Sequence, residues 1–337
     1  MATAKKNVVV IGGGTGTFAV LSGLKAYADE IALTAIVAVS DSGGSNGRLR
    51  DELGTLPFAD ARMALIALAD ETKMDSQTLR ELMLYRFTKG VGLQGHNFGN
   101  LFLTALSEVM HSEEEAIAAA SRMLGVTGVV LPVSCEKLTL CAEYSDGLVV
   151  RGESHIDEPA PERDAHSIRR LWIEPESHET EAVRAALARA DMIVLGPGDL
   201  YTSLLAACLV GDMPALIQQA HCPFVYIGNL FSKFGQTTGY DTARYVAEVS
   251  SYVGRTPDAF FINTTPFPKE LVEKYATTKE FPVVDAGSGN ETTECVRTDL
   301  LAEEEVKTRA GDVLKRSLIR HDREKLARAL MAYLMRA

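Results

Sequence analysis

Four glycine-rich loops carry the residues that could do chemistry. Their sequences are GGGTGTFA, DSGGSNGRLR, QGHNFGN and LGPGDLYTS, beginning at residues 12, 41, 94 and 195. Glycine lets a backbone approach an anion closely, and a helix that begins directly after the loop offers unpaired N–H groups and the positive end of its dipole. These residue types therefore predict a ligand that carries phosphate and resembles a nucleotide.

The second and third loops add polar side chains to these backbone groups. The Gly/Ser turn around Ser45 can form a nest of N–H groups, and Arg48 can clamp a phosphate with two parallel hydrogen bonds. His96, Asn97 and Asn100 supply neutral donors and acceptors that suit a base, a sugar or a phosphate. Asn97 is equally suited to cap the helix that follows it, and a lone histidine such as His96 is more often structural than catalytic.

Acidic side chains raise the question of a metal. Asp41 and Asp60 could hold a divalent cation such as Mg²⁺ through oxygen ligands, although two ordinary turn aspartates would look the same. Asp199 in the fourth loop is interpreted as a helix cap, because a carboxylate that pointed inward would weaken anion binding. The sequence shows no Ser-His-Asp order, HExxH or GxxxxGK[ST] motif, so no catalytic residue is assigned.

One motif points to a different class of protein. From Gly14 the first loop also fits GxGxxA, and Asp41 lies at a plausible distance downstream for a contact with a ribose. An NAD-dependent oxidoreductase is therefore an alternative, motivated by this motif alone. A second loop rich in Gly, Ser and Arg would be superfluous in a dehydrogenase.

The elements that must position these loops alternate between strands and helices. Apolar runs at 7–11 and 33–39 flank a helical pattern and form one βαβ unit. A second alternation begins near Arg189, with strands expected at 192–195, 224–227 and 259–262. We expect the loops at the carboxyl ends of strands, where open α/β sheets bind ligands. The predicted fold is a Rossmann-like, doubly wound and mostly parallel α/β sheet.

The rest of the chain completes a single domain over 1–337. Apolar residues with a period near 3.6 predict a helix-rich insertion over about 59–124, with helices at 61–70, 76–87, 97–110 and 113–124. A strand at 129–133 and a hairpin follow, the hairpin formed by 138–144 and 148–152. We expect an exposed loop at 155–170, a helix at 200–210, a helix at 240–253 and a mobile loop at 285–297. An amphipathic helix at 321–336 is expected to pack back through Leu326, Leu330 and Leu334.

The composition excludes several classes of protein. Acidic residues outnumber basic ones by 45 to 34, and the resulting charge of −11 repels nucleic acid and anionic membranes. No stretch approaches the roughly 18 apolar residues of a membrane span. The five cysteines are scattered without a CxxC pair, as expected of buried thiols in a reducing cytosol. We therefore expect a cytoplasmic protein without nucleic-acid binding or membrane insertion, and a homo-oligomer as the common default.

Five stretches together resemble one family. They are VVVIGGGTG, SDSGGSNGRLRDELGTLPFADAR, GHNFGNLFLTALSE, VLGPGDLYTS and LIRHDREKLARAL, and they cover nearly the whole chain. Their combination is similar to the gluconeogenesis factor (YvcK-type) proteins, relatives of the CofD-like 2-phospho-L-lactate transferases of deazaflavin cofactor synthesis. The resemblance implies a Rossmann-like fold that binds UDP-N-acetylglucosamine or a similar nucleotide sugar. It also implies a cytoplasmic regulator of gluconeogenic growth, cell shape and envelope (peptidoglycan) synthesis, acting through a protein partner, with no established reaction.

The resemblance also implies which residues face the ligand. Tyr275 and Arg320 match the family's Tyr and Arg that hold the nucleotide sugar, and a Tyr ring and a guanidinium suit a uracil face and a diphosphate. Gly13, Gly14 and Thr15 are expected at the diphosphate or the sugar. The remaining expected contacts are Asp41, Ser45, Arg48, Asp60, His96, Asn97, Asn100, Tyr201 and Ser203.

The chain departs from the family pattern at several places. Ser42 stands where a second Asp is usual, and Phe58 and Ala59 replace the common Pro-Gly. Asp199 replaces a usual Ser, and 231–236 differs from the commoner loop, so its residues carry no assignment. The carboxylate missing at Ser42 weakens the case for a metal. A metal-assisted transferase, with the two acids named above on the metal, is the alternative to a regulator without turnover.

Overall fold

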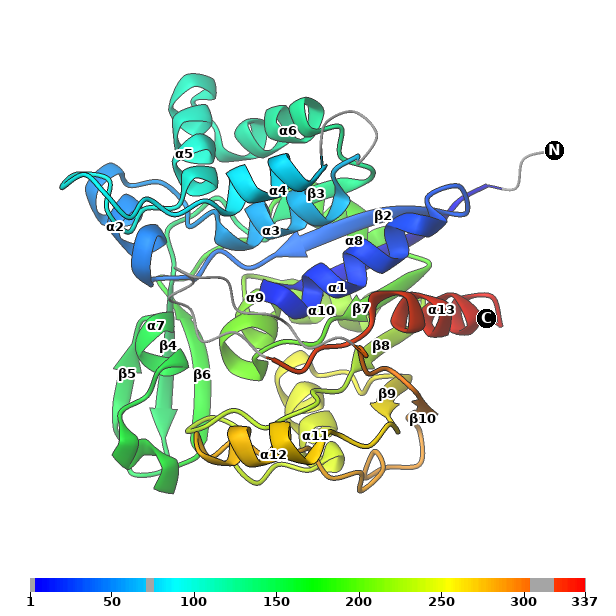
Figure 1. Ribbon diagram of the computed structural model, residues 1–337. Coiled ribbons are helices and arrows are strands. Elements are labelled where there is room, and N and C mark those ends of the chain that lie inside the picture. The colour runs from blue at the N-terminus through cyan, green and yellow to red at the C-terminus, as the bar shows by residue number, and fades with distance from the viewer. Residues whose placement is uncertain (1–3, 71–75, 304–317, 337) are drawn as a thin grey trace.

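The computed structural model describes residues 4–70, 76–303 and 318–336. Its centre is a seven-stranded sheet in the order β10-β9-β8-β7-β1-β2-β3, in which neighbouring strands are parallel. The strands are β1 (Lys6–Gly12), β2 (Ile31–Val37), β3 (Val129–Pro132), β7 (Met192–Leu195), β8 (Phe224–Ile227), β9 (Ala259–Asn263) and β10 (Glu294–Thr298). Helices cover both faces of this sheet (Figure 1). The predicted Rossmann-like, doubly wound α/β fold class is confirmed.

The helices pack in groups around the sheet. α1 (Gly14–Leu24) contacts α3 (Ala59–Leu68) and α13 (Arg323–Leu334), and α10 (Met213–Gln219) contacts α8 (Glu181–Ala188) and α11 (Thr242–Val253). The other α-helices are α2 (Gly44–Leu53), α4 (Ser76–Leu84), α5 (Phe98–Met110), α6 (Glu113–Leu124), α7 (Glu153–Asp157), α9 (Ala206–Cys208) and α12 (Lys269–Ala276). Two short 3₁₀ helices are η1 (Lys25–Tyr27) and η2 (Pro161–Ala165), and η3 (Leu200–Leu205) is a π-helical turn. Helices α3 to α6 occupy the range predicted to be helix-rich.

A small antiparallel sheet lies beside the large one (Figure 1). Its order is β5-β4-β6, with β4 (Thr139–Tyr144), β5 (Val149–Arg151) and β6 (Ile168–Glu174). The pairing of β4 with β5 confirms the predicted hairpin. The prediction of an exposed loop at 155–170 is confirmed only in part: many of its side chains are exposed, but the range holds the end of α7, all of η2 and the start of β6. Ile156 and Ile168 anchor it in the core, at 0% and 3% exposure, between polar neighbours that hide the pattern.

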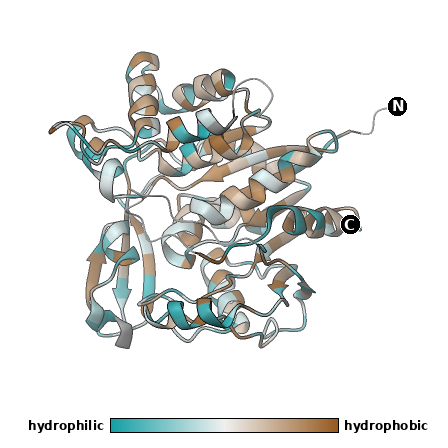
Figure 2. Ribbon diagram, viewed as in Figure 1, coloured by the Kyte–Doolittle hydropathy of each residue, from teal (hydrophilic) through white to brown (hydrophobic). Residues whose placement is uncertain are grey.

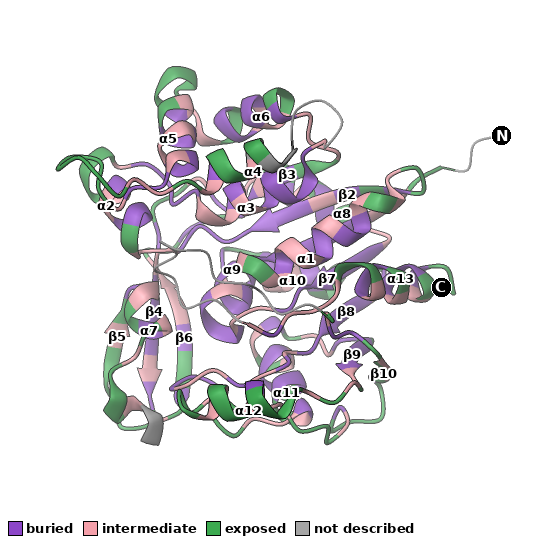
Figure 3. Ribbon diagram, viewed as in Figure 1, coloured by how far each residue is buried: buried purple, intermediate pink, exposed green. Residues whose placement is uncertain are grey.

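Burial explains why the central strands read as continuous apolar runs. Both faces of β1 and β7 are covered, so Val8, Val9, Val10, Ile193 and Val194 are all buried whichever face they point to. Figure 2 shows hydrophobic colouring along the central strands, and Figure 3 shows the same strands as buried. Strands of this kind leave their carboxyl ends as the accessible edge of the sheet, where loops can carry function.

Three other predictions need correction. Residues 44–50 of the predicted Gly/Ser loop at 41–50 belong to α2, because Gly43 caps the start of this helix and Gly54 ends it in the left-handed region at φ +73°. The predicted mobile loop at 285–297 ends in β10, which pairs with β9. The helix expected over 200–210 opens as the π-helical turn η3. Helices α7, α8, α10 and α12 and strand β6 were not predicted either.

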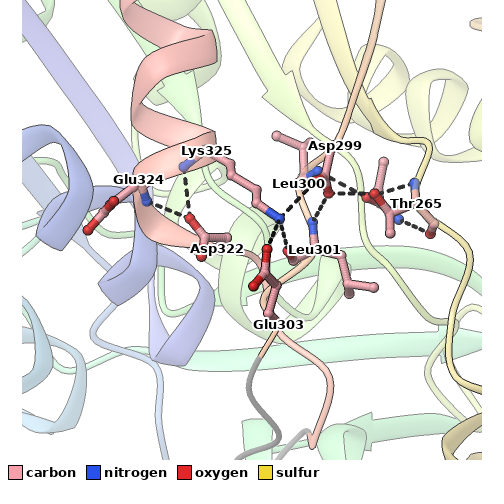
Figure 4. A network of polar contacts seen from close by, with 9 residues as sticks. Thr265, Asp299, Leu300, Leu301, Glu303, Asp322, Glu324 and Lys325 are labelled. Carbon is pink, nitrogen blue, oxygen red and sulfur yellow. Dashed lines mark hydrogen bonds and ion pairs between the residues drawn. The ribbon is translucent and has the colours of Figure 1, made fainter.

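The C-terminal helix is tied to the carboxyl end of β10. Lys325 lies 2.8 Å from the carboxylate of Asp299, which also accepts a hydrogen bond from Thr265 (Figure 4). The Lys325 and Thr265 hydrogen bonds lower the pKa of Asp299 to about 2. Asp322 caps the helix by accepting from the N–H groups of Glu324 and Lys325. Leu326, Leu330 and Leu334 are buried, which confirms the predicted packing.

Within residues 4–70, 76–303 and 318–336, no single helix is both long and apolar enough to span a bilayer. The pair Leu200–Cys208 and Met213–Gln219 reaches the required length and hydropathy together, but it bends by 75° at the break.

Candidate functional site

The two glycine-rich loops that follow β1 and β7 meet at the centre of the sheet. Strand β1 lies between β2 and β7, so the chain runs outward in one direction from β1 and in the other from β7. Such a topological switch point is where open α/β sheets bind ligands. A Cβ at Gly16 would lie 1.9 Å from the carbonyl oxygen of Pro197, and a Cβ at Gly198 would lie 3.7 Å from the carbonyl oxygen of Gly13. The loops are therefore packed backbone to backbone, which requires glycine at Gly16.

A carboxylate lies at the amino end of α1. Asp60, in the first turn of α3, accepts a hydrogen bond from the N–H of Gly14 over 2.8 Å. A Cβ at Gly13 would lie 2.1 Å from the other Asp60 oxygen, so Gly13 is required for the contact. Burial and the nearby charge of Asp41 raise the pKa of Asp60 to about 7, against the opposing effects of the Gly14 bond and Arg62. Asp60 thus occupies the position predicted for a phosphate.

Asp41 is fixed by the start of α2. Its Oδ1 accepts from the N–H of Gly43 over 2.8 Å, and its Oδ2 accepts from the side-chain amide of Asn46 over 2.6 Å. Burial raises the pKa of Asp41 despite these two bonds. The charge of Asp41 raises the pKa of Asp60, so the two carboxylates lie near one another.

A series of hydrogen bonds joins α2 to the start of α5. Asn46 Oδ1 accepts from Asn100 Nδ2 over 2.6 Å, and Asn97 Oδ1 caps α5 by accepting from the N–H of Asn100. Ser45 Oγ accepts from the N–H of Asn97 over 3.1 Å and lies 3.2 Å from His96 Nδ1. The structure therefore brings together the predicted residues of the second and third loops, and Asn97 is the predicted cap.

His96 and Arg48 lie next to these hydrogen bonds between α2 and the third loop. His96 is 5% exposed, and burial together with the positive charge of Arg48 lowers the pKa of its imidazole. Arg48 Nη1 donates to the carbonyl oxygen of Gln94 over 3.0 Å, which ties α2 to the third loop. The imidazole is therefore mainly neutral at pH 7, which suits hydrogen bonding more than anion binding.

Helix α7 contributes two acids that the sequence interpretation missed. Glu153 and Asp157 are spaced one turn apart, and Ser42 Oγ accepts from the N–H of Ser154 over 3.0 Å, which fixes α7 against the second loop. Burial and the charges of Asp41, Asp157 and Asp60 raise the pKa of Glu153 to about 9. The available signal was a pair of carboxylates with i, i+4 spacing directly after a predicted strand.

Lys233 contacts two acids, Asp157 of α7 and Asp199 of the loop after β7. Lys233 Nζ lies 3.5 Å from Asp199 Oδ2 and 3.4 Å from Asp157 Oδ1. Asp199 makes no side-chain capping bond, so its prediction as a side-chain cap is wrong. Burial raises the pKa of Asp199, and Lys233 opposes this shift. Although burial opposes its charge, the two acids raise the pKa of Lys233 above its usual value.

The remaining predicted residues lie in different surroundings. Tyr201 is fully buried, with its hydroxyl 2.9 Å from that of Tyr240, whereas Thr15 is exposed. The backbone N–H of Ser203 donates to Asp199. The Tyr275 hydroxyl accepts from the backbone N–H groups of Leu318 and Ile319, over 2.7 and 3.2 Å. Tyr275 thereby fixes the segment that leads into Arg320.

The predicted metal pair has a limited donor set. Within the ranges described, no three His, Cys, Asp or Glu side chains converge to hold a metal ion. Gly43, Asn46 and Gly14 already donate to Asp41 and Asp60. Proteins commonly hold Mg²⁺ through one or two carboxylates together with water and substrate phosphates. The pair fits an Mg²⁺ that a phosphate-bearing ligand helps to hold, and does not fit a cation held by protein alone.

The fold and the site define an α/β protein with a doubly wound parallel sheet and glycine-rich loops at its switch point. The family model described as 2-phospho-L-lactate transferase CofD matches residues 8–314, and the chain belongs to this CofD family. It is 37% identical over 334 residues to the gluconeogenesis factor of Listeria monocytogenes, covering 98% of this chain and 96% of that one. The gluconeogenesis factor of Listeria innocua is 38% identical over the same length and coverage.

A solved structure shows the same architecture. The crystal structure of a UPF0052 family protein from Bacillus halodurans matches with a TM-score of 0.85 at 32% identity. The match covers 98% of this chain and 99% of that one. The resemblance read from the motifs is therefore confirmed at the level of family and fold.

Proposed function

We propose that this protein binds a nucleotide sugar, UDP-N-acetylglucosamine or a close analogue, at the switch point. In this proposal it acts as a cytoplasmic regulator of gluconeogenic growth, cell shape and envelope synthesis, through a protein partner and without turning its ligand over. The name shared by the Listeria relatives supports the metabolic context. We also propose a homo-oligomer, as the common default for such proteins.

One observation carries the binding proposal. The loops after β1 and β7 pack directly on each other, through Gly16 against Pro197 and Gly198 near Gly13. Two glycine-rich backbones at one switch point give a diphosphate close access to main-chain N–H groups from both halves of the sheet.

A second feature supports a nucleotide base nearby. Tyr275 packs on Phe231 with ring centroids 4.4 Å apart, and Phe231 packs on Phe267 at 4.9 Å. These rings form an aromatic surface next to the segment that carries Arg320, since Tyr275 binds its backbone at Leu318 and Ile319. In the proposal, the aromatic surface holds the base and Arg320 the diphosphate.

The second candidate function is a metal-assisted transferase of the 2-phospho-L-lactate transferase type. The family description and the acids Asp41, Asp60 and Glu153 favour it. Asp41 and Asp60 would hold Mg²⁺ together with ligand phosphates, and the ion would neutralise charge on the transferred group. Glu153, with its raised pKa, would hold a proton close to them.

Thermal unfolding tests the two candidates together. The midpoint is measured with UDP-N-acetylglucosamine, with GDP and with NAD, each with and without magnesium. A ligand at a hundred times its dissociation constant adds about 2.7 kcal/mol to the free energy of unfolding, which shifts the midpoint of a chain of this size by about 5 °C. A shift with the UDP sugar alone and without magnesium supports the regulator. A shift only with GDP or NAD, or only with magnesium, contradicts it.

A further inference from the structure

Four polar side chains from three separate elements meet at one place beside the glycine-rich loops. Asp157 comes from α7, Asp199 from the loop after β7, and Lys233 and Gln236 from the loop after β8. Asp157 Oδ1 accepts from Gln236 Nε2 over 3.3 Å and lies 3.4 Å from Lys233 Nζ. We call these four residues the Lys233 cluster. Lys233 and Gln236 belong to the segment that the sequence left unassigned.

The backbone fixes Lys233 in place. Its N–H donates to Thr237 Oγ1 over 2.8 Å, and the Tyr245 hydroxyl donates to the same oxygen over 2.8 Å. The N–H groups of Gln236 and Thr237 both donate to the Lys233 carbonyl oxygen. Because this turn is held from α11, the backbone of Lys233 needs no reordering for its side chain to meet a ligand.

The Lys233 ammonium and Gln236 Oε1 keep hydrogen-bonding capacity that the described part of the protein does not use. The Lys233 ammonium lies 3.4 and 3.5 Å from its acids, longer than the roughly 2.7–2.9 Å of a strong charge-assisted hydrogen bond. Gln236 is 2% exposed, its Nε2 donates to Ile156 O and Asp157, and its Oε1 has no hydrogen-bond partner within the described ranges. A buried amide oxygen without a donor is costly, so a partner from outside the chain is expected there.

The cluster is also open to solvent on one side. The side chains of Asp157, Asp199 and Lys233 keep 26%, 38% and 26% of their surface exposed. A ligand bound at the neighbouring loops can therefore reach all three. Asn229 holds the loop of Lys233 against the glycine-rich loop after β7. Its Nδ2 donates to the carbonyl oxygen of Gly198 over 2.7 Å.

The charges decide what kind of group fits. Two carboxylates and one ammonium carry a net charge of −1 when ionised, and protonation of one acid brings the sum only to zero. A phosphate would therefore gain little from the cluster. A hydroxyl or amide group can donate to a carboxylate and accept from an ammonium at the same time, which uses both signs of charge.

We propose that the Lys233 cluster is the subsite for the sugar of the nucleotide sugar, a neutral polyhydroxylated group, and that Lys233 and Asp199 determine which sugar is accepted. This proposal rests on the proposed nucleotide-sugar function and adds the position of the sugar to it. Within the cluster, Asp199 and Lys233 place an acid and a base from two different loops 3.5 Å apart.

Isothermal titration with two probes tests the subsite. UDP-N-acetylglucosamine carries the sugar and UDP lacks it, so their ratio of affinities isolates the sugar contact. We expect Lys233→Met to weaken binding of the UDP sugar by about tenfold or more, the loss typical of a hydrogen bond to a charged group, and to change UDP binding by less than about twofold. Asp199→Asn should also weaken the UDP sugar selectively.

The same titrations can overturn the proposal. If a phosphate lies at the cluster, Lys233→Met weakens both probes equally and Asp199→Asn tightens UDP, because a like charge is removed. If wild type binds UDP as tightly as the UDP sugar, the sugar makes no contact and the subsite is wrong. If wild type binds neither probe, the proposed function itself fails.

Two controls separate binding from folding. Lys25→Met removes one positive charge at the opposite edge of the sheet, after the end of α1, and should leave both affinities unchanged. The thermal midpoint of each variant shows whether it is folded. Should Lys233→Met fail to fold, Asp199→Asn, which keeps the shape of the side chain, decides the result.

Discussion

The carboxylate of Asp60 accepts a hydrogen bond from the backbone N–H of Gly14, over 2.8 Å, at the amino end of α1. The sequence predicts a phosphate at this position, since free N–H groups and the helix dipole favour an anion there. Burial raises the pKa of Asp60 to about 7, so the group is poised between its neutral and charged forms near neutral pH. A phosphate-bearing ligand has to share this helix end with Asp60.

Removing the charge of Asp60 should therefore improve metal-free binding. Asp60→Asn keeps an oxygen that can accept from Gly14 but carries no charge. At pH 8 with a chelator, we expect it to bind UDP-N-acetylglucosamine several-fold more tightly than wild type, because repulsion on the order of 1 kcal/mol disappears. Asp51→Asn, an acid of α2 whose side chain is 70% exposed, is the control. Weaker binding by Asp60→Asn would show that the carboxylate contacts the ligand directly.

The contact between Gly13 and Asp60 predicts an energetic coupling. A Cβ at Gly13 would lie 2.1 Å from Asp60 Oδ2, so Gly13→Ala must displace the carboxylate from Gly14. We expect Gly13→Ala to lower the free energy of unfolding by about 1–3 kcal/mol. In an Asp60→Ala background the loss should shrink by at least about 0.5 kcal/mol. Urea unfolding of the four proteins gives the double-mutant cycle, and strictly additive losses would contradict this geometry.

The raised pKa of Glu153 predicts how the free energy of unfolding depends on pH. Its pKa is raised from 4.5 to about 9 in the folded protein, chiefly by burial, so the folded state binds this proton more tightly than the unfolded state. Its contribution to the free energy of unfolding is full below about pH 4.5 and is lost as the pH rises toward 9.

The matching variant is Glu153→Gln, which stays neutral throughout. Relative to wild type, we expect it to gain at least about 1.4 kcal/mol between pH 5 and pH 9, the equivalent of one pKa unit. Urea unfolding at both pH values measures the gain. Glu158→Gln, at an exposed acid just after α7, controls for net charge. Equal pH dependence of wild type and Glu153→Gln would refute the buried, protonated acid.

Tyr275 should affect both stability and ligand binding. Its hydroxyl is the acceptor for the N–H groups of Leu318 and Ile319, so Tyr275→Phe leaves two donors without it. We expect a loss of about 1–3 kcal/mol in the free energy of unfolding and weaker binding of the UDP sugar, because Arg320 follows this segment. Arg320→Ala should weaken binding several-fold or more. Tyr85→Phe, at a half-exposed tyrosine, should change neither, and unaltered affinity in both Tyr275→Phe and Arg320→Ala would sink this assignment.

The sequence was sufficient where local pattern determines structure. The continuous apolar run of β1 and the glycines that follow it predict a buried parallel strand and a turn into α1, and the structure has both. Asn97 was recognised as a cap because a side-chain acceptor at that position satisfies an open N–H of α5. These features depend on neighbouring residues only.

The missed residues depend on contacts between distant segments. Glu153 and Asp157 enter the site because Ser42 binds the N–H of Ser154, 112 residues along the chain. Lys233 acquires its surroundings from α7 and the loop after β7, which no local pattern around it indicates. From the sequence alone, such a polar segment cannot be distinguished from an exposed loop, because its contacts are with residues far away along the chain.

The most direct measurement is a crystal structure of the protein with UDP-N-acetylglucosamine. We expect the diphosphate against the loops 12–16 and 196–198, the base on the aromatic surface of Tyr275, and the sugar within hydrogen-bond distance of Lys233. Density for the ligand away from the carboxyl ends of β1 and β7, or no ligand at concentrations that saturate the thermal shift, would contradict the proposed site.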